Sequence, residues 1–117
     1  MKANFPSELD RNGYAPSILQ EDCTRCFACG RRDRKLDRHE VFPAAFRQKS
    51  KKYGLWVCLC HDPCHLGRDG YQYDASKSYG LKAYAQAEAM KTYGWSTTEF
   101  IHMFGKNYLP ERIDDDN

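Results

Sequence analysis

The sequence lacks any long apolar run. None of its stretches approaches the roughly 20 consecutive apolar residues that a membrane-spanning helix needs, and the mean hydropathy is −0.82. The first eight residues, MKANFPSE, also lack the apolar stretch of a secretory signal peptide. These absences exclude a transmembrane protein and predict a cytoplasmic protein with no membrane partner.

The sequence also lacks a strong excess of charge of either sign, because 18 basic and 16 acidic residues give a formal net charge of +2. The basic residues are unevenly spread, however, and nine of them stand against three acidic residues between positions 30 and 52. Such a block indicates a face that meets a polyanion, with a solvated surface loop as the alternative. The residues predicted to contact nucleic acid are Arg38, Arg47, Lys49, Lys51 and Lys52.

Two segments have the composition of β-strands. Residues 36–42 form the first and end before Pro43, and residues 53–60 form the second. The basic segment separates the two. Residues 1–22 have no clear periodicity and contain proline and glycine, so we expect them to form an arm that wraps around the domain.

The last third of the sequence predicts two helices. Apolar residues recur at helical spacing from Leu81 to Tyr93, and Gly94 can end this helix in a left-handed conformation. The sequence STTE at 96–99 is a capping box, which predicts the start of a second and shorter helix. Residues 110–117 are acidic and are expected to form a flexible tail.

Six cysteines in so short a chain indicate either a disulfide scaffold or a metal site. Without a secretory signal a reducing compartment is favoured, and with it the metal site. Four thiolates from two turns satisfy tetrahedral zinc, and the pairs with turn-like spacing are Cys26, Cys29, Cys60 and Cys64. Cys23 and Cys58 are alternative ligands, because they lie close to Cys26 and Cys60 in the sequence, but we expect them to be free thiols.

Three motifs, taken together, resemble those of HNH endonucleases that carry a zinc ion. They are CFAC at 26–29, DRHEVF at 37–42 and LCHDPCH at 59–65. The resemblance is to small phage and prophage HNH-like proteins in particular. It implies an α+β fold with a ββα-metal core, in which a two-stranded hairpin packs on a helix. With this core the chain divides into an arm (1–22), the zinc-bound core (23–75), a C-terminal helical extension (76–109) and the acidic tail (110–117).

The resemblance also implies a metal-dependent endonuclease that hydrolyses DNA phosphodiester bonds. In this family a histidine on the first strand acts as general base, and a histidine at the start of the helix binds a divalent cation such as Mg²⁺, Mn²⁺ or Ni²⁺. His39 and His65 match these positions. The resemblance allows two alignments: either His39 is the base and Arg38 occupies a ligand position, or His39 binds the cation and Glu40 is the base. The residues Val41 and Phe42 that follow favour the second, because family members often have the sequence His-His-Ile-Phe there.

Two positions differ from the family pattern. The asparagine expected near the second strand is replaced by Gly54 and Leu55, and a later histidine is replaced by Gln72 or Tyr73. The alternatives are therefore a catalytically decayed, zinc-stabilised nucleic-acid-binding module, and a protein-interaction module that binds a host protein. A phage or prophage origin implies the cytoplasm of a bacterial host.

Overall fold

The computed structural model describes residues 9–110, so the start of the predicted arm and nearly all of the predicted acidic tail lie outside the described residues. The fold is α+β and is built around two antiparallel strands, β1 (Leu36–Glu40) and β2 (Trp56–Cys60). Their register pairs Leu36 with Cys60 and Glu40 with Trp56. The predicted pair of strands is confirmed.

Both strands are shorter than the sequence predicts, at the ends next to the segment that connects them. Strand β1 ends at Glu40 rather than at residue 42, and β2 begins at Trp56 rather than at residue 53. Gly54 has a φ of 72°, and a Cβ atom there would lie 2.3 Å from the backbone oxygen of Pro16. The chain therefore turns at Gly54 before β2 begins. On the other strand, buried Ser50 bonds both the amide (3.0 Å) and the carbonyl (2.8 Å) of Phe42. These two bonds take Phe42 out of the strand pairing.

The segment between the strands is helical. The short helix η1 (Ala44–Phe46) leads into α1 (Arg47–Lys52), so this part of the basic block is a helix rather than a loop. After β2 comes η2 (His61–His65), a helical turn with a kink at Asp62. The hairpin therefore leads directly from Cys60 into a turn that contains two histidines.

The two predicted C-terminal helices are present. Helix α2 (Ala75–Tyr93) begins where the Asp74 carboxylate accepts the amide of Lys77, and it ends at Gly94, whose φ is 72°. Helix α3 (Thr97–Phe104) begins with the predicted capping box between Ser96 and Glu99. Both boundaries follow from local hydrogen bonds that the sequence specifies.

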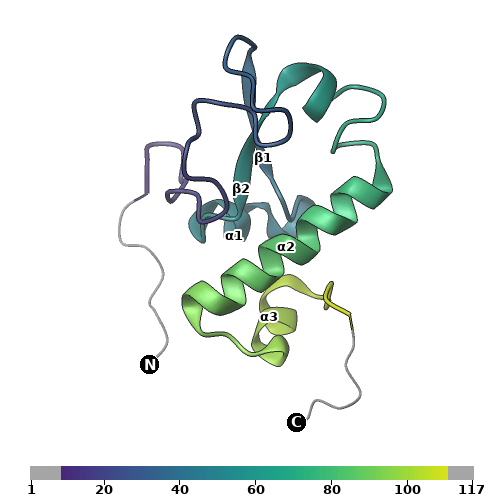
Figure 1. Ribbon diagram of the computed structural model, residues 1–117. Helices are drawn as coiled ribbons and strands as arrows, with labels where there is room; N and C mark the ends of the chain where they lie inside the picture. Colours follow the sequence, from purple (N-terminus) through teal and green to yellow (C-terminus); the bar gives the residue numbers. More distant parts are fainter. Residues whose placement is uncertain (1–8, 111–117) are drawn as a thin grey trace.

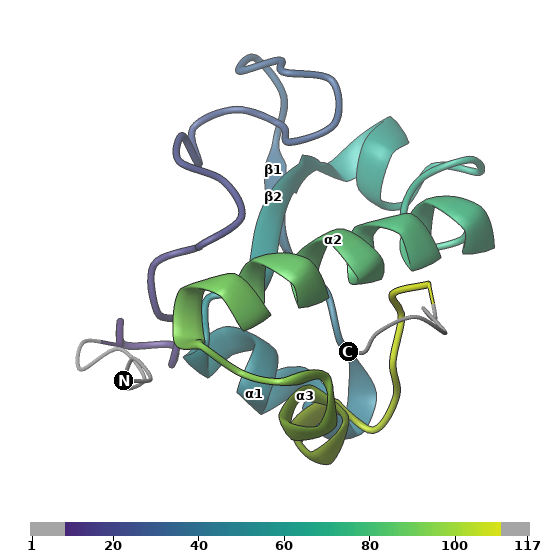
Figure 2. The ribbon, with the colours of Figure 1, turned by 60° about the horizontal axis from the view of Figure 1, so that its bottom comes forward.

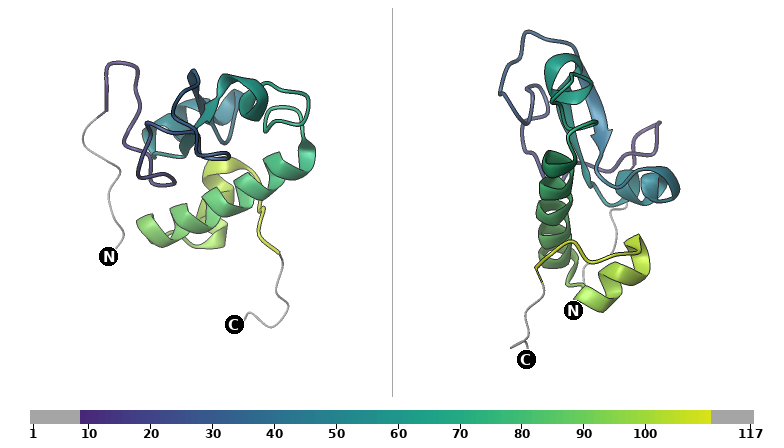
Figure 3. Two further views of the ribbon diagram at one scale, coloured as in Figure 1. Left: turned by 45° about the horizontal axis from the view of Figure 1, so that its top comes forward. Right: turned by 90° about the vertical axis from the view of Figure 1, so that its right-hand side faces the viewer.

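Helix α2 runs across one side of the hairpin, and α3 folds back against α2 (Figures 1 and 2). The main core joins Val57 and Leu59 of β2 to the buried faces of these helices, which are formed by Leu81, Ala85, Ala89, Tyr93, Phe100 and Phe104. The segment after α3 returns along α2 (Figure 3), where the amide of Tyr108 donates to Gln86 at 2.7 Å.

The N-terminal arm covers the opposite side of the hairpin. Trp56 and Cys58 face Tyr14 in a second apolar cluster, and the Trp56 indole N–H donates to the carbonyl of Ala15 at 2.8 Å. Every residue of β2 is buried, since it is covered on both faces. Within residues 9–110, none of the helices combines the length and apolar character that crossing a membrane requires.

Candidate functional site

The four cysteines that the sequence pairs lie together at the end of the hairpin. The Sγ atoms of Cys26, Cys29, Cys60 and Cys64 are all within 4.8 Å of one another. One pair comes from the turn that precedes Gly30, and the other comes from the end of β2 and from η2. Tetrahedral zinc with bonds of about 2.3 Å needs sulfurs about 3.8 Å apart. The cluster could therefore hold a metal ion such as zinc.

The electrostatics of this cluster fit a cation. Burial opposes ionisation of Cys26, but the amides of Cys29 and Cys60 lower its pKa to about 6. Burial and the neighbouring thiols raise the pKa of Cys64. The Cys26 thiolate is thus readily formed, while the Cys64 thiol resists ionisation until a cation neutralises the negative charge beside it.

Cys23 and Cys58 lie outside this cluster, as the sequence predicts. Cys58 is buried against Tyr14 and Trp56, and Cys23 packs against the same group. Burial raises the pKa of Cys58 to about 11, so this thiol stays protonated at neutral pH. It behaves as a small apolar core residue.

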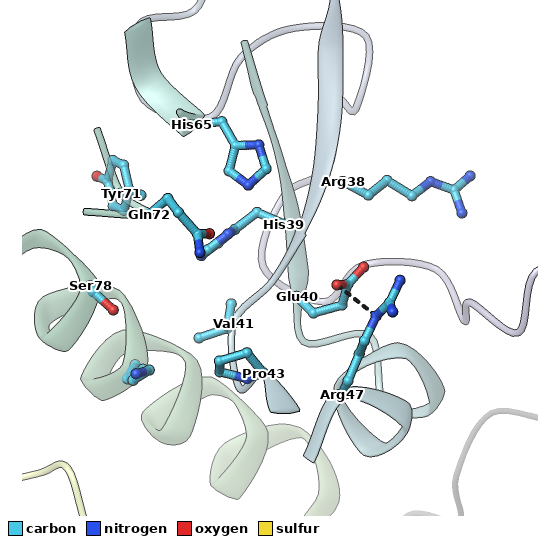
Figure 4. A pocket seen from close by; sticks show the side chains of 11 residues that line it. Arg38, His39, Glu40, Val41, Pro43, Arg47, His65, Tyr71, Gln72 and Ser78 are labelled. Carbon is cyan, nitrogen blue, oxygen red and sulfur yellow. Dashed lines mark hydrogen bonds and ion pairs between the residues drawn. The ribbon is translucent and has the colours of Figure 1, made fainter. Parts of the chain in front are cut away.

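A second polar site lies beside the hairpin, where His39 and His65 face each other. Their ring centroids are 5.2 Å apart, with the ring planes at 72°. His39 projects from β1, and His65 is the last residue of η2. Figure 4 shows the two side chains converging on one side of β1. The structure thus brings together two histidines that are 26 positions apart in the sequence.

Asp37 lies at the centre of the hydrogen bonds around this site. Its Oδ2 atom is 2.8 Å from Nδ1 of His65 and 2.7 Å from Nδ1 of His61. Burial opposes ionisation of Asp37, but its bonds to His65 and His61 lower its pKa overall. The ionised carboxylate accepts from Nδ1–H, which leaves Nε2 of His65 as the nitrogen with a free lone pair.

His39 is held in the neutral form. Burial lowers the pKa of His39 to about 4, with further lowering from the neighbouring His65 and Lys82 side chains. Its imidazole is therefore unprotonated at pH 7 and can accept a proton or bind a cation. No aspartate or glutamate bond to a ring nitrogen of His39 is found among residues 9–110.

The histidine pair lines a cavity of about 430 Å³. Helix α2 contributes Ser78 and Lys82 to its wall, and the loop after η2 contributes Tyr71 and Gln72. Sequence reasoning did not select Lys82, because nothing in the local sequence shows which face of α2 meets β1. A local signal could have found Asp37, because its spacing of two from His39 on a strand places both side chains on one face.

Glu40 points away from the histidine pair, to the other side of β1 (Figure 4). Its carboxylate accepts the hydroxyl of Tyr14 and accepts Nε of Arg47 at 3.2 Å. Arg38 points to this side as well and pairs with Asp10 at 2.9 Å. Glu40, Arg38 and Arg47 still line the edge of the cavity.

The three lysines predicted to bind nucleic acid do not line this cavity. The ammonium of Lys49 donates to the carbonyl of Met103 at 2.9 Å. The ammonium of Lys51 lies 4.7 Å from the Tyr14 ring centroid, and that of Lys52 lies 5.6 Å from the Tyr53 ring centroid. These lysines thus have different neighbours, and Arg38 and Arg47 are the predicted nucleic-acid-binding residues that line the edge of the histidine cavity.

Comparisons with protein-family models, with curated proteins and with solved structures gave no match.

Proposed function

We propose that the chain is a metal-dependent HNH-type endonuclease that hydrolyses DNA phosphodiester bonds. The observation that carries this proposal is the convergence of His39 and His65, with ring centroids 5.2 Å apart, in a cavity beside the hairpin. The order of strand, strand and histidine-bearing turn is the one that the resemblance to small phage and prophage HNH-like proteins implies. On this proposal the hairpin, η2 and the cysteine cluster form a zinc-bound ββα-metal core.

In this proposal Cys26, Cys29, Cys60 and Cys64 hold a structural zinc ion. Four protein ligands leave no open position, which is typical of structural rather than catalytic zinc. The cluster joins the turn before β1 to the end of β2. It therefore fixes the position of η2, and with it the position of His65. A chain of 117 residues has a modest core, so this cross-link contributes much of its stability.

The free Nε2 of His65 is the atom that would hold the catalytic cation, with Asp37 as the positioning residue on the other ring nitrogen. Mg²⁺, Mn²⁺ or Ni²⁺ bound there would stabilise negative charge on the phosphate during cleavage. Asp37 fixes the tautomer and the ring orientation of His65, since Nδ1–H is held by the carboxylate.

The geometry favours His39 over Glu40 as the general base. His39 is unprotonated at neutral pH and faces the cavity from the same side as His65. Glu40 is on the other side of the strand, where it is engaged by Tyr14 and Arg47. Glu40 therefore has a positioning role for Arg47, whose guanidinium, with the ammonium of Lys82, can receive the phosphate at the cavity edge.

Plasmid nicking by purified protein tests this proposal. Supercoiled DNA should be nicked in Mg²⁺, Mn²⁺ or Ni²⁺ and left intact without divalent cation. The variant His65→Ala should abolish nicking, whereas the matched variant His102→Ala, at an exposed position of α3, should keep it. Nicking that survives His65→Ala, or that is absent with all three cations, would contradict the proposal.

A second candidate is a zinc-stabilised nucleic-acid-binding module without catalysis. The specific observation in its favour is Gln72, which lines the cavity beside His39 where the resemblance implies a histidine. An amide cannot replace imidazole as a proton acceptor or as a strong ligand. Binding of DNA without cleavage in any of the three cations would support this candidate instead.

A further inference from the structure

Helix α2 and the segment after α3 together form a surface on which lysines and tyrosines are interleaved. Its members are Tyr79, Lys82, Lys106 and Tyr108, and we call them the lysine–tyrosine surface. The ammonium of Lys106 lies 5.3 Å from the centroids of both tyrosine rings, and that of Lys82 lies 5.8 Å from the Tyr108 ring. The two rings meet edge to face at 5.3 Å.

The charge of this surface is not neutralised within the described chain. Five arginines of the first half are paired with carboxylates, at distances of 2.7 Å (Arg31–Asp33), 2.8 Å (Arg32–Asp22), 2.9 Å (Arg38–Asp10), 3.2 Å (Arg47–Glu40) and 3.9 Å (Arg25–Asp22). Among residues 9–110, Lys82 and Lys106 have aromatic rings as neighbours and no carboxylate partner. An aromatic ring holds an ammonium in place but leaves its full positive charge.

Part of the surface is exposed, with Lys82 and Tyr108 half-buried, and its C-terminal segment is held in a fixed position. Tyr79 is 46% exposed, and Lys106 is also exposed. The buried amide side chain of Gln86 fixes the C-terminal segment, because it accepts the Tyr108 amide at 2.7 Å and donates to Asn107 at 2.8 Å. The two tyrosines therefore keep their arrangement before any ligand arrives, which lowers the entropic cost of binding.

The surface is also continuous with the histidine site. Lys82 belongs to both, since it lines the cavity that contains His39 and His65. Ser78, the neighbour of Tyr79 on α2, lines the same cavity. An anionic chain that leaves the cavity along α2 would meet Lys82 first and then the tyrosine pair with Lys106.

We propose that the lysine–tyrosine surface binds an unpaired, single-stranded nucleic acid segment that continues out of the histidine cavity. Phosphates of such a segment pair with the two ammoniums, and its bases stack on the tyrosine rings. A duplex satisfies the ammoniums but keeps its bases inside, so it cannot use the rings. This proposal rests on the nucleic-acid function proposed above and adds to it a preference for DNA that has an unpaired segment beside the cleaved bond.

The test measures binding rather than cleavage, in the His39→Ala background and without added divalent cation. A fluorescent single-stranded oligonucleotide of about 12 nucleotides is titrated and followed by anisotropy, at several salt concentrations. The double variant Lys82→Gln/Lys106→Gln should weaken binding and lower the salt slope by about 0.7 for each lost phosphate contact. The matched variant Lys91→Gln, at the far end of α2, should leave the slope unchanged.

The tyrosines are tested separately, with Tyr79→Leu, which keeps an apolar side chain and removes the aromatic face. This variant should weaken single-strand binding by at least about fivefold. It should not change the weaker binding of a duplex of equal length or of polyglutamate. Equal effects on all three probes, or tighter binding of the duplex than of the single strand, would overturn the proposal.

The outcomes also separate this proposal from the nuclease function. Metal-dependent nicking, together with an unchanged salt slope in the double lysine variant, would overturn the surface and leave the nuclease standing. Single-strand binding that depends on Lys106 and Tyr79, without nicking in any cation, would overturn the nuclease and support the surface as part of a binding module.

Discussion

The Oδ2 atom of Asp37 lies 2.8 Å from Nδ1 of His65 and holds that ring so that its other nitrogen, Nε2, keeps a free lone pair. The same oxygen is 2.7 Å from Nδ1 of His61. One carboxylate on β1 thus fixes two rings of η2, and it connects the hairpin to the turn that follows it. The arrangement resembles the carboxylate–histidine pairs that orient metal ligands in proteins.

Replacing Asp37 should weaken cation binding without removing a direct ligand. The variant Asp37→Asn loses the ionised acceptor for Nδ1–H of His65, so we expect the affinity for Mn²⁺ to fall by about 10- to 100-fold. Calorimetric titration of zinc-loaded protein measures this change. The control is Asp33→Asn, since Asp33 pairs with exposed Arg31 at 2.7 Å and lies outside the hydrogen bonds of His65. Equal Mn²⁺ affinity in both variants would show that Asp37 does not act on His65.

The cysteine cluster leads to a prediction about stability. Cys60→Ser should lose the bound zinc, and its cooperative thermal unfolding should disappear or move far below that of the parent protein. Zinc binding contributes on the order of 10 kcal/mol in small domains, which is comparable with the whole stability of such a domain. Elemental analysis should find about one zinc per chain in the parent protein and in Cys23→Ser, because Cys23 lies outside the cluster.

A strong chelator provides an independent check of the same site. It should unfold the parent protein and Cys23→Ser alike, since both depend on the metal. A chelator-treated protein that is free of zinc but melts as before would contradict the structural role of the cluster.

We expect the buried side chain of Ser50 to stabilise the backbone at the end of β1. Ser50 is fully buried, and its hydroxyl bonds both the amide and the carbonyl of Phe42. The variant Ser50→Ala leaves both backbone groups without a partner, so we expect it to lower the free energy of unfolding by about 1–3 kcal/mol. Urea denaturation measures this loss. Ser76→Ala, exposed on α2, should change stability by less than about 0.5 kcal/mol.

Local signals in the sequence predicted much of the fold. The capping box at Ser96 and the left-handed Gly94 specify helix ends through contacts within four residues, and both are present in the structure. The cysteine pairs are also local, because each sits in its own turn, and only their mutual approach needs the hairpin. Strand pairing then brings all four sulfurs together.

Contacts between distant segments were beyond sequence reasoning. The hydroxyl of Tyr14 reaches Glu40 across 26 positions, and this contact holds the Glu40 carboxylate on the side of the arm. Lys82 enters the cavity only because α2 crosses the hairpin at one particular angle. Hydrophobic periodicity identifies the buried face of a helix, but it does not identify which polar residue at its edge meets a given strand.

The two alignments at His39 and Glu40 differ in one measurable way. Because His39 faces His65 and Glu40 points to Tyr14 and Arg47, we expect His39→Ala to slow metal-dependent cleavage by about 10²- to 10⁴-fold, the usual contribution of a general base. Glu40→Gln keeps the shape of the side chain and a carbonyl oxygen that can still accept from Arg47. It should therefore retain cleavage within about tenfold of the parent rate, outside the general-base range.

Single-turnover cleavage of a plasmid at saturating Mn²⁺ measures the chemical step in each variant. Slow cleavage by Glu40→Gln with normal cleavage by His39→Ala would make Glu40 the base instead, and would require its carboxylate to leave Tyr14 when DNA binds.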